Sequence, residues 1–248
     1  MHILKSSSEK VELHTDESFC LLAYTLTFEG KRRTPSSLSI GEDSITADFG
    51  ALGAIEDHIR MEGDLLVLHR TWNLRQEGSY RLQAAFSYDD QELENKLFIP
   101  ALWYQDNSKG KGCFPSAERS ANWSFLETRM SIPCCAQLSN GKRLFTCASE
   151  PAQEQRFVAS VATERHGMII SIPGSEWPYS YQGKQSLVDT SALALPCLAI
   201  PSEGMVYTRT FYLSNQKEES SLEAYCLFVE QLNALMPTDK PAGLDWTL

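Results

Sequence analysis

The stretch LLVLHRTWNL, residues 65–74, decides the fold class of this chain. Successive side chains of a β-strand point to opposite faces, so the stretch divides into two sets. One face carries Leu66, Leu68, Arg70, Trp72 and Leu74, and the other carries Leu65, Val67, His69, Thr71 and Asn73. The turn RQEG follows at 75–78, and YRLQAAFSY at 80–88 alternates again. Two alternating runs joined by a short glycine-containing turn predict a β-hairpin.

Similar runs continue on both sides of this stretch. Residues 19–28, 143–148, 157–163, 167–172 and 205–213 are rich in apolar, β-branched and aromatic residues, and Asn140-Gly141 is a strong turn signal. Ten or more strands at this spacing predict a mainly β fold in which large antiparallel sheets pack face to face.

The end of the chain has a different period. In SSLEAYCLFVEQLNALM, residues 220–236, apolar side chains recur at helical spacing, and Ser220 with Glu223 has the spacing of a capping box. Pro237 cannot continue a helix. The pattern predicts one carboxy-terminal helix, followed by a linker-like tail.

Charge and composition narrow the function. The 248 residues include 22 Lys and Arg against 32 Asp and Glu, a formal charge of -10. This balance argues against a nucleic-acid partner and against an anionic membrane surface. The chain starts without the apolar core of a signal peptide and has no apolar run of about 18 residues, which predicts a cytoplasmic protein. Neutral sugars, small metabolites or a protein partner remain compatible.

The seven cysteines follow no metal-binding pattern. There is no CxxC pair and no Cys/His set with zinc spacing. We therefore predict no metal, no cofactor and no disulfide, and we interpret most of the thiols as small buried apolar groups.

Catalytic motifs are also scarce. The sequence lacks GxSxG, a P-loop, HExxH and a dinucleotide-binding glycine motif. A sugar epimerase would need an acid and a base on opposite faces of a sugar ring, and His69 with Glu127 or with Glu176 is a candidate pair. A histidine that is merely packed or solvated on a sheet is the commoner situation.

Three segments combine aromatic and polar side chains, the mixture that sugar-binding surfaces need. They are FIPALWYQDNSKGKGCFPS at 98–116, SANWSFLETRMSIP at 120–133 and SEWPYSY at 175–181. The candidate ligand-binding residues in them are Trp103, Tyr104, Asp106, Asn107, Trp123, Glu127, Arg129, Trp177 and Tyr179. We expect at least two of the segments to converge near the carboxy-terminal helix. The alternative is that they are ordinary strand ends, with Glu127 and Arg129 forming a structural ion pair.

Three stretches together, FIPALWYQDN, NWSFLETRMSIP and MIISIPGSEWPYSY, resemble the amino-terminal β-domain of bacterial six-hairpin glycosidases. The resemblance covers roughly residues 15–236. It implies an antiparallel β-supersandwich, similar to the galactose-mutarotase fold, over 1–215. It also implies that 216–248 is a helix and linker leading to an absent (α/α)6 domain.

The same resemblance implies a role. In similar enzymes the catalytic carboxylates usually come from the helical barrel, so it implies a non-catalytic domain that shapes a sugar-binding cleft, with a carbohydrate and the (α/α)6 domain as partners. No catalytic residue carries over to this chain. Two alternatives stay open: a self-contained aldose epimerase or mutarotase-like enzyme with a His/Glu acid–base pair, and a protein-interaction module.

Overall fold

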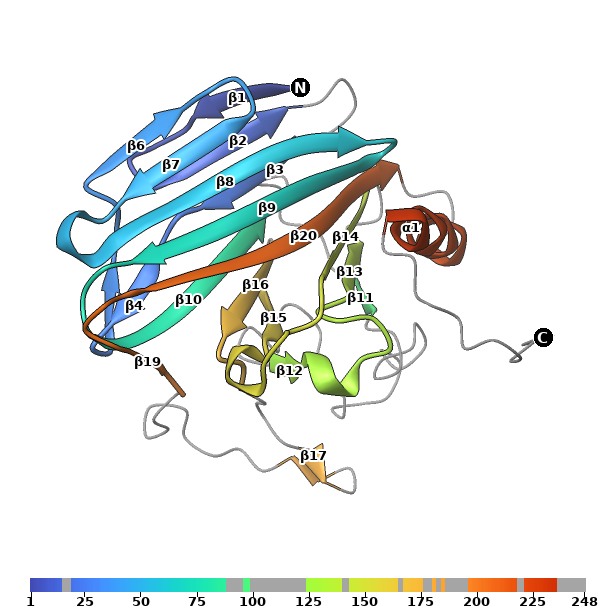
Figure 1. Cartoon of the computed structure of the whole chain (residues 1–248). Coiled ribbons are helices and arrows are strands. Elements are labelled where there is room, and N and C mark those ends of the chain that lie inside the picture. The colour runs from blue at the N-terminus through green and yellow to red at the C-terminus, as the bar shows by residue number, and fades with distance from the viewer. Residues whose placement is uncertain are drawn as a thin grey trace.

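The protein is a sandwich of two antiparallel β-sheets with a helix at its carboxy-terminal end (Figure 1). The computed structural model describes residues 1–14, 19–87, 96–98, 124–139, 143–164, 167–175, 180–181, 184–185, 196–217 and 221–235. All strand pairs in these ranges are antiparallel, which confirms the predicted fold class.

The first sheet has ten strands and runs in the order β1-β2-β3-β10-β16-β15-β12, with β19 and β4 pairing β10, and β5 pairing β4. Its strands are β1 (His2–Lys5), β2 (Lys10–His14), β3 (Phe19–Ala23), β4 (Leu26–Phe28), β5 (Lys31–Arg33), β10 (Gly78–Ser87), β12 (Ser124–Leu126), β15 (Ser160–Glu164), β16 (Gly167–Ile172) and β19 (Leu198–Ile200).

The second sheet has eight strands in the order β11-β13-β14-β20-β9-β8-β7-β6 and lies in front of the first sheet in Figure 1. Its strands are β6 (Ser37–Ile40), β7 (Ser44–Asp48), β8 (Gly53–Glu62), β9 (Leu65–Leu74), β11 (Lys96–Phe98), β13 (Ala136–Ser139), β14 (Arg143–Ser149) and β20 (Met205–Lys217). A small separate ladder joins β17 (Ser180–Tyr181) to β18 (Lys184–Gln185).

The main core lies between the two sheets and follows the predicted alternation. Leu66, Leu68, Trp72 and Leu74 of β9 are buried in it, together with the alternate residues of β10 and β20. Trp72 stacks on Tyr207, its cross-strand partner on β20, with ring centroids 5.6 Å apart. We call the core-facing side of the eight-stranded sheet its inner face and the opposite side its outer face.

The predicted hairpin of residues 65–74 with 80–88 is wrong. Strand β9 pairs with β8 and β20, whereas β10 pairs with β3, β4, β16 and β19 in the other sheet. The short link after Leu74 is a corner that carries the chain from one sheet to the other. Gly78 has φ 150° there, and a side chain at this position would run into the ring of Phe28. Alternation cannot distinguish a corner from a hairpin, because both keep the same side chains in the core.

The other predicted elements are present: β16 has the predicted bounds, 167–172, and the others have shifted ends. Residues 19–28 form two strands, β3 and β4, and β20 extends beyond the predicted 213 to Lys217. Strand β15 begins at Ser160, and a short 3-10 turn (Gln155–Phe157) occupies the start of the predicted 157–163 run.

The predicted helix is α1 (Ser221–Leu235), and it packs on the outer face of the eight-stranded sheet. Phe228 and Leu232 of α1 are buried against Leu65 and Val67 of β9 and Tyr212 of β20. This smaller apolar cluster also contains the buried Cys135 and Ala148 and the partly buried Ile132, Tyr225, Val229 and Leu235. In the described ranges, no helix is long and apolar enough to cross a membrane.

Candidate functional site

Most of the predicted ligand-binding residues lie outside the described residues: Trp103, Tyr104, Asp106, Asn107, Trp123, Trp177 and Tyr179. The predicted convergence of their segments stays a prediction for the same reason. Glu127 and Arg129 are described, and they lie at the two ends of a 3-10 turn (Glu127–Arg129) that follows β12.

Glu127 is a buried structural carboxylate, with 5% of its surface exposed. Its Oε1 accepts a hydrogen bond from the Ala159 N–H at 2.7 Å, and its Oε2 forms an ion pair with Nη2 of Arg209. The expected structural ion pair of Glu127 with Arg129 is therefore wrong in its partner. Glu127 pairs with Arg209 of β20, whereas Arg129 is exposed.

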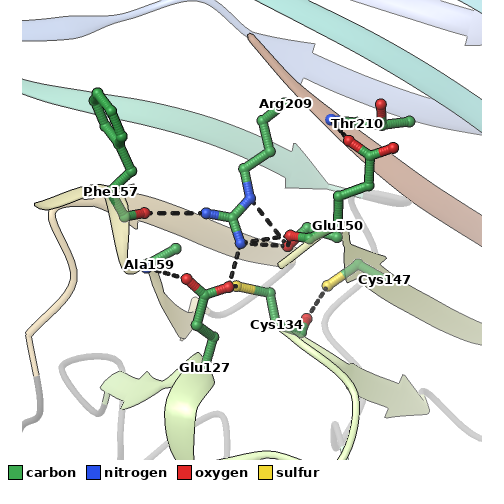
Figure 2. Close-up of polar contacts among 9 residues, drawn as sticks. Glu127, Cys134, Cys147, Glu150, Phe157, Ala159, Arg209 and Thr210 are labelled. Carbon is green, nitrogen blue, oxygen red and sulfur yellow. Dashed lines mark hydrogen bonds and ion pairs between the residues drawn. The ribbon is translucent and has the colours of Figure 1, made fainter. Parts of the chain in front are cut away.

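Arg209 is the centre of this buried network (Figure 2). Besides Glu127, its guanidinium donates to Ser149 Oγ at 2.8 Å and 3.2 Å. It also donates to the carbonyl oxygens of Glu150 at 2.7 Å and Phe157 at 3.2 Å. Burial alone would lower the pKa of Arg209, but its neighbours, first Cys134 and then Glu127, hold the pKa above its ordinary value. Arg209 therefore ties β20 to β14, to the 3-10 turn after β12 and to the 3-10 turn before β15.

A second buried network lies next to the first. Arg70 makes a bidentate pair with Asp57, with Nε to Oδ1 at 2.8 Å and Nη2 to Oδ2 at 2.6 Å. Tyr24 donates its hydroxyl to Asp57 Oδ2 at 2.6 Å, and Arg70 also donates to the Gln83 carbonyl at 3.1 Å. Arg70 and Asp57 have no side-chain exposure. Burial would lower the pKa of Arg70, but Asp57 outweighs it and the pKa is raised.

The two arginines are direct cross-strand partners, Arg70 on β9 and Arg209 on β20. Like charges in such positions repel, and in a core they also lose hydration. Each arginine therefore needs its own carboxylate, which Asp57 and Glu127 supply. The inner face thus holds two neighbouring ion pairs, Arg70 with Asp57 and Arg209 with Glu127, whose charges balance. We call these four residues the inner row. We assign it a structural role, because its ionisable groups are buried and engaged.

The outer face carries a second polar group beside α1. His69 Nδ1 lies 3.2 Å from Oγ1 of Thr210, its cross-strand partner. The Thr210 N–H donates to the Glu150 carboxylate at 3.3 Å. Tyr212 follows Thr210 on the same face of β20. Burial is the main cause that raises the pKa of Tyr212 to about 12, and the Glu150 carboxylate is the second. His69 and Glu150 are half-buried, so this group is accessible where the inner row is not.

The proposed pairing of His69 with Glu127 cannot act on one sugar ring. Glu127 bonds to Arg209 on the inner face, whereas His69 lies on the outer face of the same sheet. Glu176 and His166 lie outside the described residues. The half-buried carboxylate of Glu150 is connected to His69 through Thr210, which is hydrogen-bonded to both residues.

Six cysteines are described, and no disulfide joins any of these six to another; Cys113 lies outside the described residues. Cys20, Cys134, Cys135 and Cys147 are buried, which confirms the interpretation of most thiols as apolar groups, while Cys197 and Cys226 are exposed. Burial raises the pKa of the Cys134 thiol to about 12. Within the described ranges, no group of three or more His, Cys, Asp or Glu could hold a metal ion.

Sequence reasoning missed the residues that organise both faces. Arg209 and Thr210 belong to MVYTRTFYL, whose alternation would have placed Arg209 inward with Tyr207 and Phe211. No such pattern marked Glu150, because it lies just after the end of β14. There its carboxylate accepts a hydrogen bond from the backbone N–H of Thr210.

No model of a known protein family matches the chain, and a search of curated proteins finds no relative. Among solved structures, a candidate aldose 1-epimerase from Escherichia coli K12 aligns with 8% identity and a TM-score of 0.42, covering 87% of this chain and 99% of that one. The GalM/aldose epimerase homologue from C. elegans aligns with 10% identity and a TM-score of 0.39, covering 87% and 82%. At these values neither likeness supports an argument about function.

Proposed function

We propose that the chain is a non-catalytic, sugar-binding β-sandwich domain of a carbohydrate-active enzyme, of the kind found before the helical barrel of six-hairpin glycosidases. The observation that carries this proposal is the state of Glu127. It is the one described carboxylate of the aromatic segments predicted to bind sugar, and it is buried, paired with Arg209 and bonded to the Ala159 N–H. A carboxylate so engaged cannot serve as a general acid or nucleophile for a sugar.

Two further features support the proposal. The two large antiparallel sheets fit the architecture that the resemblance implies. Helix α1 is anchored on the sheet through Phe228 and Leu232, as a helix leading from a sandwich into another domain would be. In this proposal the (α/α)6 domain supplies the catalytic carboxylates, and the location is cytoplasmic. An open reading frame that continues past Leu248 into helical segments would support this larger context.

The test measures catalysis and binding on the same purified chain. Polarimetry with freshly dissolved glucose and galactose measures anomer interconversion, nitrophenyl glycosides report hydrolysis, and ligand-observed NMR detects binding. We expect no rate above that of the buffer and weak binding of neutral sugars. Hydrolysis that rises in proportion to protein concentration would contradict the non-catalytic role.

One observation favours the second candidate, a self-contained aldose epimerase. His69 and Glu150 are accessible on the same face and both bond to Thr210. Ring opening needs a proton delivered to the ring oxygen and another removed from the anomeric hydroxyl, which an imidazole and a carboxylate can do. Faster anomer interconversion that is lost in both Glu150→Gln and His69→Asn would establish this candidate instead.

A further inference from the structure

The outer face of the eight-stranded sheet carries an ordered array of short polar side chains. Two rows cross four strands in register, as Thr46–Glu56–Thr71–Thr208 and Ser44–His58–His69–Thr210 from β7 through β8 and β9 to β20. We call these eight residues the outer polar array. Strands are about 4.8 Å apart and alternate residues along a strand about 6.7 Å apart, so the array presents a regular grid of hydrogen-bonding groups.

The array is accessible and is not covered by the helix. His58 and Thr208 are exposed, and five of the other six are half-buried; only Thr210 is buried. Helix α1 packs further along the same strands, on Leu65, Val67 and Tyr212. The array therefore begins where the helix-covered apolar cluster ends.

His69 is held in place with one ring nitrogen left over. Its Nδ1 is hydrogen-bonded to Thr210 Oγ1, which fixes the orientation of the ring. The described part of the chain provides no partner for its Nε2, nor for the ring of its cross-strand neighbour His58. A ligand hydroxyl can both donate to and accept from such imidazoles.

Charge selects the class of ligand. The array itself contains no Lys or Arg, its acidic residue is Glu56, and the Glu150 carboxylate adjoins Thr210. Arg60, the next outer-face residue of β8 after His58, is paired with Glu62 at 2.9 Å, so the acidic groups outweigh it. Such a surface repels phosphates, carboxylates and nucleic acid. Val206, the outer-face residue of β20 next to Thr208, is exposed, but the array itself has no Phe, Tyr, Trp, Met or Arg side chain of the kind that forms the centre of a protein interface. A neutral ligand rich in hydroxyl groups satisfies both conditions.

We infer that the outer polar array is the sugar-binding surface of this chain, and that it binds a neutral saccharide lying across β8, β9 and β20. The inference rests on the proposed function and adds the place and the ligand class. It locates binding on a different face from Glu127. His69 and Thr71 are the central residues of this surface, because β9 lies between β8 and β20 and each has an array neighbour on both of these strands.

The experiment compares two matched variants with the wild type. The double variant His69→Ala/Thr71→Val removes the central groups of the array. The control is Thr27→Val, which changes another half-buried threonine, on β4 of the ten-stranded sheet. Thermal unfolding of all three proteins checks folding. Binding of glucose, galactose and maltotriose is measured by NMR, and backbone amide shifts of the wild type show where the sugar lies.

We expect the double variant to weaken binding about tenfold, because it removes two hydrogen-bonding groups, and the control to leave binding unchanged. In the wild type, sugar should shift the amides of His58 and Thr208. Sugar binding that is equal in all three proteins, with shifts elsewhere, would overturn the inference while the proposed function stands. Wild type that binds no neutral sugar would overturn both, and tighter binding of glucose 6-phosphate than of glucose would overturn the argument from charge.

Discussion

On strands β9 and β20, neighbouring residues along the chain point to opposite faces of the sheet, and the two faces have different roles. On the inner face Arg70 and Arg209 are cross-strand neighbours, and on the outer face His69 and Thr210 are. The inner pair is buried and bound to Asp57 and Glu127, whereas His69 and Thr210 bind each other and leave His69 Nε2 without a described partner. Polar side chains on one backbone thus serve stability on one side and remain available to ligands on the other.

The largest effect should come from breaking the inner ion pair. Glu127→Ala leaves the Arg209 charge buried without its carboxylate, which typically costs about 3–5 kcal/mol of unfolding free energy. Glu127→Leu combined with Arg209→Met should recover much of this loss, because no isolated charge remains. Urea unfolding of the two proteins measures both. A loss below about 1 kcal/mol for Glu127→Ala would remove the contrast between the faces.

Alkaline pH should also lower the free energy of unfolding, because the protein buries thiols that stay protonated only while it is folded. Burial raises the pKa of Cys20 and of Cys134 to about 12, from 9.0 in the unfolded chain. Above pH 9 the unfolded chain loses these protons while the folded protein keeps them, so stability falls as pH rises toward 12. Each such group contributes about 1.4 kcal/mol per pH unit. Urea midpoints at pH 8.0, 9.5 and 10.5 should decline, with little change below pH 8. A midpoint that is constant throughout would contradict this prediction.

Removing the Thr210 hydroxyl tests the contact that orients His69. Thr210→Val keeps the shape of the side chain and should cost about 1 kcal/mol, the contribution of one hydrogen bond. NMR signals of the His69 ring should change, while those of His58 should stay. Unchanged His69 signals would show that Thr210 does not hold the ring.

The smallest effect is expected on the exposed part of the outer polar array. Thr208→Ala should change the free energy of unfolding by no more than about 0.5 kcal/mol, as surface substitutions usually do. Its chain neighbour Tyr207 stacks on Phe157 with ring centroids 4.1 Å apart, so Tyr207→Ala should cost about 3 kcal/mol or more. Equal costs for the two would mean that the outer face is part of the packed structure.

The sequence predicted the elements better than their connections. The strand at 65–74 and its two faces are as expected, because alternation reports directly which side chains enter a core. The link between β9 and β10 was misassigned, since a corner between sheets and a hairpin leave the same pattern. The partner of Glu127 was also beyond reach, because Arg209 is 82 residues away along the chain.

The candidate site was only partly predictable. His69 was singled out from its strand, but its bond to Thr210 depends on the pairing of β9 with β20, which adjacent residues do not encode. Seven of the nine predicted ligand-binding residues lie outside the described ranges, and their role stays a prediction.

The position of β20 has a consequence for synthesis of the chain on the ribosome. It lies between β14 and β9 in the middle of the eight-stranded sheet, although it is the last strand of that sheet to be made. About 130 residues separate the end of β9 from the start of β20, which takes roughly 7–26 s at about 5–20 residues per second. During that interval β9 exposes an unpaired edge, and β14 exposes another once Ser149 has been added. Unpaired edges promote aggregation of nascent β-proteins. The nascent chain is therefore most in need of a chaperone before Met205 emerges.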